Sequence, residues 1–235
     1  MKALIITPVK DSLETTKLTL KAVSQAKGDS EYWIFDDFSK RETREYLQAN
    51  QFKYGYSLTH LEDVTNHPSP NYHLVLRMAQ RKAIEQNLPL IIVESDVIVK
   101  PDTFRELITL NNRLRNPGLI GAITTDRAGN YNFPYGHEKR SRKGIEDTRR
   151  SLSFCCTLIS PAYLKRYDFG ELSEKKDWYD IFISRQAKRL GFRNYLSKRT
   201  TVVHLPHSSR PWKQLKYTSP LKYYYYKWVK KRDKI

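Results

Sequence analysis

The first 125 residues alternate short apolar runs with longer segments in which apolar side chains recur at helical spacing. Strands are expected near residues 3–7, 32–35, 56–59, 90–93 and 119–124, and helices near residues 13–27, 40–49, 72–86 and 101–115. Strands that alternate with helices in this way form a mostly parallel sheet with helices on both faces. Ligands of such sheets bind beyond the carboxyl ends of the strands. The sequence therefore predicts an α/β fold with a site at one edge of its sheet.

Acidic side chains follow two of these apolar runs. Asp36 and Asp37 follow one run, and Glu94, Ser95 and Asp96 follow another. Residues two apart on an extended strand point to the same side, so the carboxylates of Glu94 and Asp96 should converge. Two such carboxylates repel each other unless a cation lies between them. The pattern favours a divalent cation with open positions for ligand phosphates, and two solvated acids at the start of a loop are the alternative.

The turn after the first expected strand contains no glycine. Residues 7–11 read Thr-Pro-Val-Lys-Asp, whereas loops that cradle phosphates with backbone N–H groups need glycine. This disfavours a P-loop nucleotide hydrolase and a dinucleotide-binding Rossmann site. A metal and cationic side chains would have to neutralise a diphosphate instead. Asp36 or Asp37 could then accept a hydrogen bond from a base or ribose, with a turn or helix cap leading into Ser39 as the alternative.

The second half of the chain is less regular. Residues 126–150 pass from Gly, Asn, Tyr and Pro to a run of basic side chains, and we expect a loop there. A buried strand with Cys155 and Cys156, a helix over 177–190 and a short strand over 201–204 follow. Adjacent cysteines cannot bridge each other without strain, so we expect inert buried thiols in a reducing compartment.

The chain is strongly basic. It carries 42 Lys and Arg against 25 Asp and Glu, a formal net charge of +17 over 235 residues. No apolar run approaches the ~18 residues of a membrane-spanning helix, and the apolar stretch at residues 3–6 is too short for a signal peptide, so we expect a cytoplasmic protein. Residues 217–234 interleave lysines with tyrosines and Trp228. This mixture suits peripheral contact with the inner face of an anionic membrane, and a packed C-terminal helix is the alternative.

Several segments together resemble glycosyltransferase family 2, whose members have the GT-A fold. Leu4–Val9 is similar to the opening apolar strand of the family, which contains a proline. Phe35–Ser39 is similar to its Asp-Asp-x-Ser turn, and Val93–Asp96 is similar to its Asp-x-Asp type of metal motif. Residues 176–192 resemble the acidic acceptor-side motif of the family and the helix after it, and Val203-His204 resembles its late histidine. The resemblance spans residues 2–207.

The resemblance implies an inverting, metal-dependent glycosyltransferase of bacterial type with a mostly parallel, Rossmann-like sheet. It would move a sugar from a nucleotide diphosphate donor, foremost a UDP-sugar, to a hydroxyl of a saccharide or lipid-linked glycan, as in the synthesis of lipopolysaccharide or another cell-surface polysaccharide. Residues 1–125 would form the nucleotide-sugar-binding half and residues 126–207 the acceptor-binding and catalytic half of one domain. Residues 208–235 would form a basic aromatic tail, and no nucleic acid is expected as a partner.

The resemblance also implies roles for individual residues. Asp96 would be the principal ligand of Mn2+ or Mg2+, with His204 as a second ligand and Glu94 supporting the metal or the ribose. Asp177 is the first choice and Asp180 the second for the base that takes the acceptor proton. The nucleotide sugar would contact residues at the strand ends and on the helix before the metal motif, namely Thr7, Pro8, Asp36, Asp37, Arg77, Glu94, Ser95 and Asp96.

Departures from the family pattern leave alternatives open. Glu94 stands where the metal motif usually opens with Asp, and Lys176 stands where an acid is usual. One extra residue separates Asp177 from Asp180, and both acids could instead cap a helix. His207 is a rival to His204 as metal ligand. A nucleic-acid-binding protein that uses its basic loop and tail is one alternative function. A sugar-phosphate nucleotidyltransferase, which would need a glycine-rich loop after the first strand, is another.

Overall fold

A computed structural model describes residues 2–136, 138, 144–173, 178–205 and 219–229. Its first half contains β1 (Leu4–Val9), α1 (Leu13–Ala26), β2 (Glu31–Asp36), α2 (Arg41–Tyr54), β3 (Ser57–His60), a 3-10 turn (Leu61–Asp63), α3 (Tyr72–Gln86), β4 (Leu90–Val93), β5 (Val97–Ile98), α4 (Thr103–Arg113) and β6 (Pro117–Thr125). Its second half contains β7 (Ile145–Asp147), β8 (Cys156–Ile159), α5 (Pro161–Arg166), a 3-10 turn (Phe169–Glu171), α6 (Tyr179–Arg189), β9 (Arg193–His204) and α8 (Pro220–Trp228).

The strands form one sheet in the order β3-β2-β1-β4-β8-β6-β9-β5, and β7 pairs with β9 off this path. The pairs β1–β2, β1–β4, β2–β3 and β6–β9 are parallel. The pairs β4–β8, β6–β8, β5–β9 and β7–β9 are antiparallel. It follows that β1, β2, β3, β4, β6 and β9 point in one direction and β5, β7 and β8 in the other. The predicted mostly parallel α/β sheet is confirmed.

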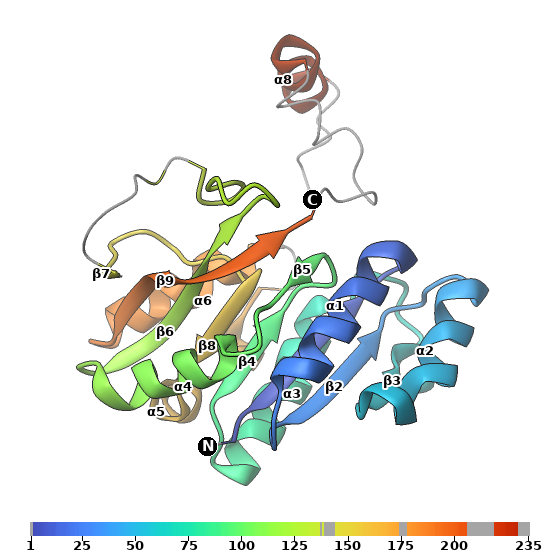
Figure 1. The fold of residues 1–235 in the computed structure, drawn as a ribbon, viewed down its shortest axis with the longest axis horizontal. Coiled ribbons are helices and arrows are strands. Elements are labelled where there is room, and N and C mark those ends of the chain that lie inside the picture. Colours follow the sequence, from blue (N-terminus) through green and yellow to red (C-terminus); the bar gives the residue numbers. More distant parts are fainter. Residues whose placement is uncertain (1, 137, 139–143, 174–177, 206–218, 230–235) are drawn as a thin grey trace.

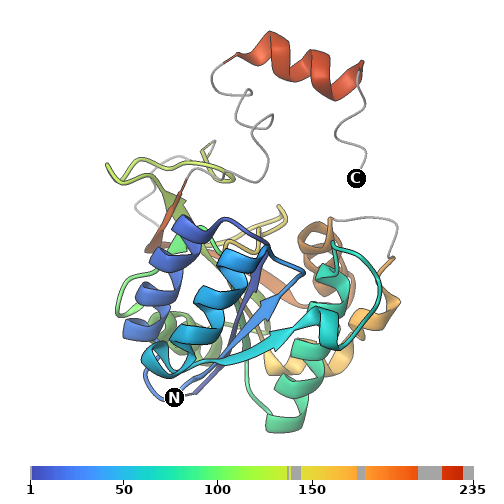
Figure 2. The same ribbon diagram turned by 90° about the vertical axis from the view of Figure 1, so that its right-hand side faces the viewer.

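Helices cover both faces of the sheet (Figures 1 and 2). Successive residues of a strand point to opposite faces, so Ile5 and Ile6 of β1 enter different apolar cores. Ile5 packs in the core beneath α1, α2 and α4, and Ile6 packs in the core beneath α3, α5 and α6. Each of these helices contributes side chains with almost no exposure, among them Leu20, Leu47, Leu76, Phe104 and Ile183.

Strand β9 is the main departure from the expected elements. A strand was expected only over residues 201–204, but β9 begins at Arg193. Its first half can contain buried polar residues because several of their polar groups find partners inside the protein. Asn194, for example, donates to the Ser184 carbonyl oxygen at 2.8 Å, and the Ser197 and Thr200 hydroxyl oxygens lie 2.9 Å apart. Within residues 126–150, where only a loop was expected, β7 forms by pairing with β9.

The two directions of the strands bring many chain segments to one edge of the sheet, the upper edge in Figure 1. Strands β1, β2, β4, β6 and β9 end at this edge, and β5 and β8 begin there because they run the other way. The acidic segments singled out in the sequence follow β2 and β4. Among the described helices, none is both long and apolar enough to cross a membrane.

Candidate active site

The antiparallel pairing of β4 with β8 brings Glu94 and Cys155 together. Val93 and Cys156 are register partners, so the residue after β4 lies beside the residue before β8. The Glu94 N–H donates to the Cys155 carbonyl oxygen at 3.1 Å, and the Cys155 thiol donates to Glu94 Oε2 at 3.2 Å. The backbone ladder therefore fixes a carboxylate against a thiol.

The antiparallel pairing of β5 with β9 brings Asp96 and His204 together. Val97 and His204 are register partners, and the Leu205 N–H donates to the Asp96 carbonyl oxygen at 2.8 Å. Asp96 is only 1% exposed, and its Oδ2 lies 3.5 Å from His204 Nε2. The Asn132 side chain donates to the His204 carbonyl oxygen at 2.9 Å and so holds the end of β9. A buried carboxylate and an imidazole thus face each other at the sheet edge.

The side chains at this edge fit a divalent cation. One ligand atom from each of Glu94, Cys155 and His204 lies within 4.8 Å of the other two, and Asp96 adjoins His204. Glu94 and His204 are half-buried, so the group can be reached from one side. Carboxylate oxygens and imidazole nitrogens are common ligands of divalent metals. The structure brings together all three residues predicted to hold the metal, and it adds a thiol that was expected to be inert.

Burial and the charges within this group shift its pKa values. Burial, and then the charge of Asp96, raise the pKa of Glu94 to about 7. Burial alone would lower the pKa of His204, but the hydrogen bond and charge of Asp96 and the charge of Glu94 raise it above its ordinary value. Burial and the charge of Glu94 raise the pKa of the Cys155 thiol. A cation bound here would relieve the repulsion between the two carboxylates.

Asp180 lies in the first turn of α6, near this group. Its carboxylate accepts a hydrogen bond from the Ile181 N–H at 2.8 Å, and burial raises its pKa. Its charge contributes to the raised pKa of Glu94, so the two carboxylates are within electrostatic reach of each other. A cavity of about 210 Å³ lies between α6 and residues 134–153, and Asp180, Arg150 and Ser153 line it. A carboxylate beside such a cavity can take a proton from a bound hydroxyl.

Asp177, the first choice for the base, lies outside the described residues. The same holds for Lys176 and for His207, the rival to His204 as metal ligand. Their roles stay predictions.

Tyr72 is a site residue that the sequence did not reveal. Its ring centroid lies 6.5 Å from that of Phe154 and 6.1 Å from that of Tyr179, so Tyr72 packs against neighbours of Cys155 and Asp180. Its hydroxyl is buried and has no hydrogen-bond partner in the described part of the chain. Burial, then the charges of Glu94 and Asp180, raise its pKa, which keeps the hydroxyl protonated. An aromatic residue that begins a helix gives no sequence signal for such a role.

Asp36 and Thr7 are already engaged inside the protein. Asp36 accepts a hydrogen bond from the Ser39 N–H at 3.2 Å and lies 2.8 Å from His60 Nδ1. This is the turn into Ser39 that was the alternative reading of Asp36. Thr7 is fully buried, and its hydroxyl accepts a hydrogen bond from Tyr32 at 3.1 Å. Thr7 therefore presents no exposed surface to a ligand in this structure.

Asp37 organises the approach to α3. Its carboxylate accepts hydrogen bonds from the Ser69 hydroxyl at 2.7 Å, from the Asn71 N–H at 2.9 Å and from the Asn71 side chain at 2.8 Å. Asn71 immediately precedes Tyr72. Asp37 therefore fixes the start of the helix that carries the Tyr72 ring into the site.

Three other predicted nucleotide contacts are accessible. Pro8 at the end of β1 and Ser95 between β4 and β5 are half-buried, and Arg77 is exposed on α3. These three side chains can meet a ligand without rearrangement of the core.

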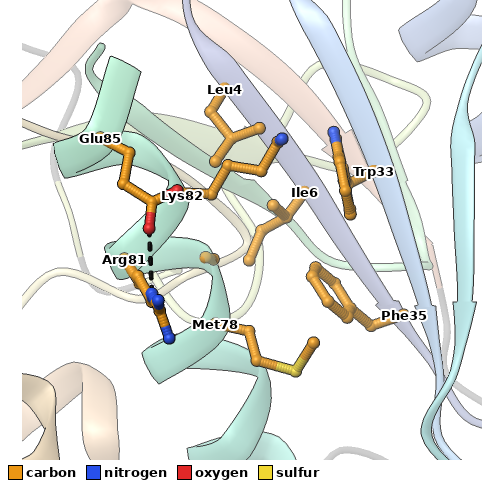
Figure 3. Close-up of a pocket in the computed structure, with 9 residues that line it drawn as sticks. Leu4, Ile6, Trp33, Phe35, Met78, Arg81, Lys82 and Glu85 are labelled. Atoms are coloured by element: carbon orange, nitrogen blue, oxygen red, sulfur yellow. Dashed lines mark hydrogen bonds and ion pairs between the residues drawn. The ribbon is translucent and has the colours of Figure 1, made fainter. Parts of the chain in front are cut away.

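A second cavity lies away from these groups. It measures about 340 Å³ and lies between β1, β2 and α3, with Arg81 and Glu85 paired at 2.9 Å on its rim (Figure 3). Lys82 Nζ lies 4.4 Å from the centroid of the Trp33 ring. Leu4, which begins β1 at the opposite edge of the sheet from Glu94, lines it. None of the predicted site residues lines this cavity, so it is separate from the metal-binding group.

Comparison with protein families accounts for this arrangement. The sequence model described as glycosyl transferase family 2 matches residues 4–169, which is more than half of the chain. The chain belongs to glycosyl transferase family 2. The match includes β1, the acidic segments after β2 and β4, and the β4–β8 pair. Membership of this family favours a glycosyltransferase over the two alternative functions, a nucleic-acid-binding protein and a sugar-phosphate nucleotidyltransferase. No curated protein sequence matches the chain.

Solved glycosyltransferase structures share the fold, which confirms the expected GT-A architecture. TarS 1–349 of S. aureus has a TM-score of 0.64 at 15% identity, covering 87% of this chain and 60% of that one. GalNAc-T7 with UDP, GalNAc and Mn2+ has a TM-score of 0.64 at 12% identity, covering 89% and 44%. Mannosyltransferase PcManGT from Pyrobaculum calidifontis, with GDP-Man and Mn2+, has a TM-score of 0.66 at 11% identity, covering 94% and 62%. The family 2 chain thus spans less than two thirds of each of these structures.

Proposed function

We propose that this glycosyltransferase moves a sugar from a nucleotide diphosphate donor, foremost a UDP-sugar, to a hydroxyl of a saccharide or lipid-linked glycan, with inversion at the anomeric carbon. The convergence of Glu94, Asp96 and His204 at the edge where the parallel strands end carries this proposal. Structures of the same fold are complexes with UDP-GlcNAc and with GDP-Man and Mn2+, which supports a nucleotide-sugar donor.

Glu94, Asp96 and His204 would hold Mn2+ or Mg2+. The bound ion would offset the charge that develops on the departing diphosphate. The protein contributes a buried carboxylate, Asp96, which the β5–β9 pairing holds in place before any ligand arrives. Pro8, Ser95 and Arg77 are the accessible residues near the strand ends and on α3 for contact with the donor.

Asp180 is the described residue best suited to take the proton of the acceptor hydroxyl. It lines the 210 Å³ cavity, and burial raises its pKa towards the range in which a carboxylate accepts a proton effectively at neutral pH. The buried Tyr72 hydroxyl is within electrostatic reach of both Glu94 and Asp180, so it would influence the charge of both groups. Asp177 remains the other proposal for the base.

The acceptor would enter from the side of residues 126–207. Arg150, Ser151 and Ser153 offer hydrogen-bond donors in the cavity beside Asp180, which suits a polyhydroxylated acceptor. We place the enzyme in a bacterial cytoplasm, in the synthesis of lipopolysaccharide or another cell-surface polysaccharide. The exposed aromatic and apolar side chains of α8 and its end, Leu221, Tyr225, Trp228 and Val229, support peripheral membrane contact through residues 217–234.

Two substitutions separate donor binding from transfer. In a screen of nucleotide sugars with Mn2+, Asp96→Asn should abolish metal-dependent donor binding measured by calorimetry. Asp180→Asn should keep donor binding but lose transfer by about 100-fold or more, as expected for removal of a general base. Asp63→Asn, on an exposed residue after β3, is the matched control and should change neither. If Asp180→Asn keeps the full rate of sugar transfer, Asp180 is not the base and Asp177 becomes the candidate. If Asp96→Asn keeps metal-dependent donor binding, the metal-dependent mechanism is refuted.

A further inference from the structure

A thiol lies among the oxygen and nitrogen ligands of the metal-binding group. Cys155 Sγ lies 3.2 Å from Glu94 Oε2, and it lies within 4.8 Å of the nearest ligand atoms of both Glu94 and His204. Cys155 is buried immediately before β8, and the Glu94–Cys155 backbone hydrogen bond holds it there. Sulfur is a soft ligand, and its presence changes which ions such a site prefers.

We infer that Cys155 is a ligand of the bound metal, so that the site selects a borderline-soft ion such as Co2+ or Zn2+ over Mg2+. The inference rests on the proposed function for what the ion does in the reaction. Binding of the ion itself can be measured without any sugar donor.

The distances suit an ion shared by these groups. Zinc binds thiolate sulfur at about 2.3 Å and imidazole nitrogen at about 2.0–2.1 Å, so two tetrahedral ligands lie about 3.6 Å apart. The Glu94–Cys155 distance of 3.2 Å and the limit of 4.8 Å for the whole group lie on either side of that value. Small side-chain rotations would bring the three groups onto one ion. The ion would take the place of the thiol proton between Sγ and Oε2, and that proton would pass to solvent.

The half-buried side of the group leaves room for further ligands. Glu94 and His204 are partly exposed, whereas Cys155 and Asp96 lie on the closed side. Sites that bind substrates on a metal keep such a position open, whereas structural zinc sites are closed by four protein ligands. The phosphate oxygens of a donor could occupy that position. Magnesium prefers six oxygen ligands in octahedral geometry. The Cys155 thiol offers sulfur instead of oxygen, so the site suits magnesium less well.

The next residue provides a matched control. Cys156 is equally buried in β8, but it belongs to no group of potential metal ligands in the part of the chain that the structure describes. Cys155→Ser and Cys156→Ser therefore remove the same atom type from adjacent, equally buried positions. Only Cys155→Ser should weaken metal binding.

The test is a titration of the full, chelator-treated chain with Co2+, followed by absorption spectroscopy. The unsubstituted protein and Cys156→Ser should develop the near-ultraviolet charge-transfer band of a cobalt–thiolate bond, and Cys155→Ser should not. Affinity for Co2+ should fall by more than about 100-fold in Cys155→Ser, since loss of even an outer-shell partner costs about 10- to 100-fold. A large excess of Mg2+ should leave the band in place.

Several results would overturn the inference: no band in the unsubstituted protein, an unchanged band in Cys155→Ser, or ready displacement of Co2+ by Mg2+. If Cys155→Ser does not fold, X-ray absorption on the zinc-loaded unsubstituted protein decides, because a sulfur neighbour at about 2.3 Å supports the inference and an all-oxygen and nitrogen shell refutes it. Donor binding measured with Mn2+ on the same samples is independent. A thiolate band without donor binding would refute the proposed function alone, and donor binding without the band would refute only the ligand role of Cys155.

Discussion

Glu94→Gln should stabilise the metal-free protein at alkaline pH while it removes a metal ligand. Burial and the neighbouring Asp96 charge raise the pKa of Glu94 from 4.5 to about 7, with a smaller contribution from Asp180 and opposing contributions from His204 and the Cys155 thiol. The folded state therefore keeps a proton that the unfolded chain has already released. Stability from this group is present below about pH 4.5 and is lost as the pH rises through about 7.

The size of the effect follows from the same pKa. Each pKa unit corresponds to about 1.36 kcal/mol, so the rise from 4.5 to about 7 costs the metal-free protein about 3 kcal/mol once the pH reaches about 8. A glutamine cannot ionise and escapes this cost. Its amide oxygen can still accept the hydrogen bond from the Cys155 thiol, so the local contacts change little.

The assay is urea unfolding in the presence of a chelator, at pH values from about 5 to 8. The free energy of unfolding of Glu94→Gln minus that of the unsubstituted protein should grow by about 2.5 kcal/mol over this range, because part of the cost is already present at about pH 5. Glu45→Gln, at a side chain that is 58% exposed on α2, is the control, and its difference should stay within about 0.5 kcal/mol. A difference for Glu94→Gln that does not change with pH would show that the carboxyl does not titrate as its burial requires.

Four further predictions concern neighbouring residues. Asn71→Ala keeps the backbone N–H bond but removes the side-chain hydrogen bonds that Asn71 donates to the buried Asp37 carboxylate and to the His67 carbonyl oxygen. It should lower stability by about 1.5–3 kcal/mol in thermal unfolding, and a change below about 0.5 kcal/mol would contradict the anchoring role. Because the pKa of His204 is raised above 6.5, protons should begin to compete with the metal at a pH above 6.5 and should compete more strongly as the pH falls. Calorimetry of metal binding should show a weaker pH dependence in His204→Gln. In the metal-free protein, the His204–Asp96 pair should add stability below about pH 6.5 that is lost as the pH rises through the raised pKa of His204. Tyr72→Phe should leave stability unchanged or raise it by up to about 1 kcal/mol, because the hydroxyl has no partner, yet it should slow transfer, and an unchanged transfer rate would remove Tyr72 from the site.

Local sequence patterns were sufficient to predict the parallel half of the fold. The apolar spacing of residues 72–86 predicts a helix with the bounds that α3 has, and the run over 90–93 predicts β4. Strand β9 is different because its polar first half is stabilised by side-chain partners on other segments, such as Asn194 with the Ser184 carbonyl oxygen. Hydrophobic alternation cannot reveal a strand whose buried groups are satisfied by hydrogen bonds rather than by apolar contacts.

Part of the candidate site could also be predicted from the sequence, and part of it could not. The predicted group of Glu94, Asp96 and His204 comes together because all three lie at strand ends, and the carboxyl ends of parallel strands share an edge. Cys155 and Tyr72 join the group through the direction of β8 and through the position of α3. Neither contact depends on local sequence, so no motif could predict it.

The reversed strands β5 and β8 are what make the site compact. If all strands ran in one direction, the residues before β8 would lie at the far edge of the sheet from those after β4. Reversal puts the start of β8 beside the end of β4, and the register then decides which side chain meets Glu94. A shift of one residue in one direction would place Phe154, which carries no metal ligand, at that position, and a shift in the other direction would place Cys156 there. The register therefore decides that the side chain that meets Glu94 is that of Cys155. A substitution that disturbed the β4–β8 pairing would be expected to impair metal binding without touching a single ligand.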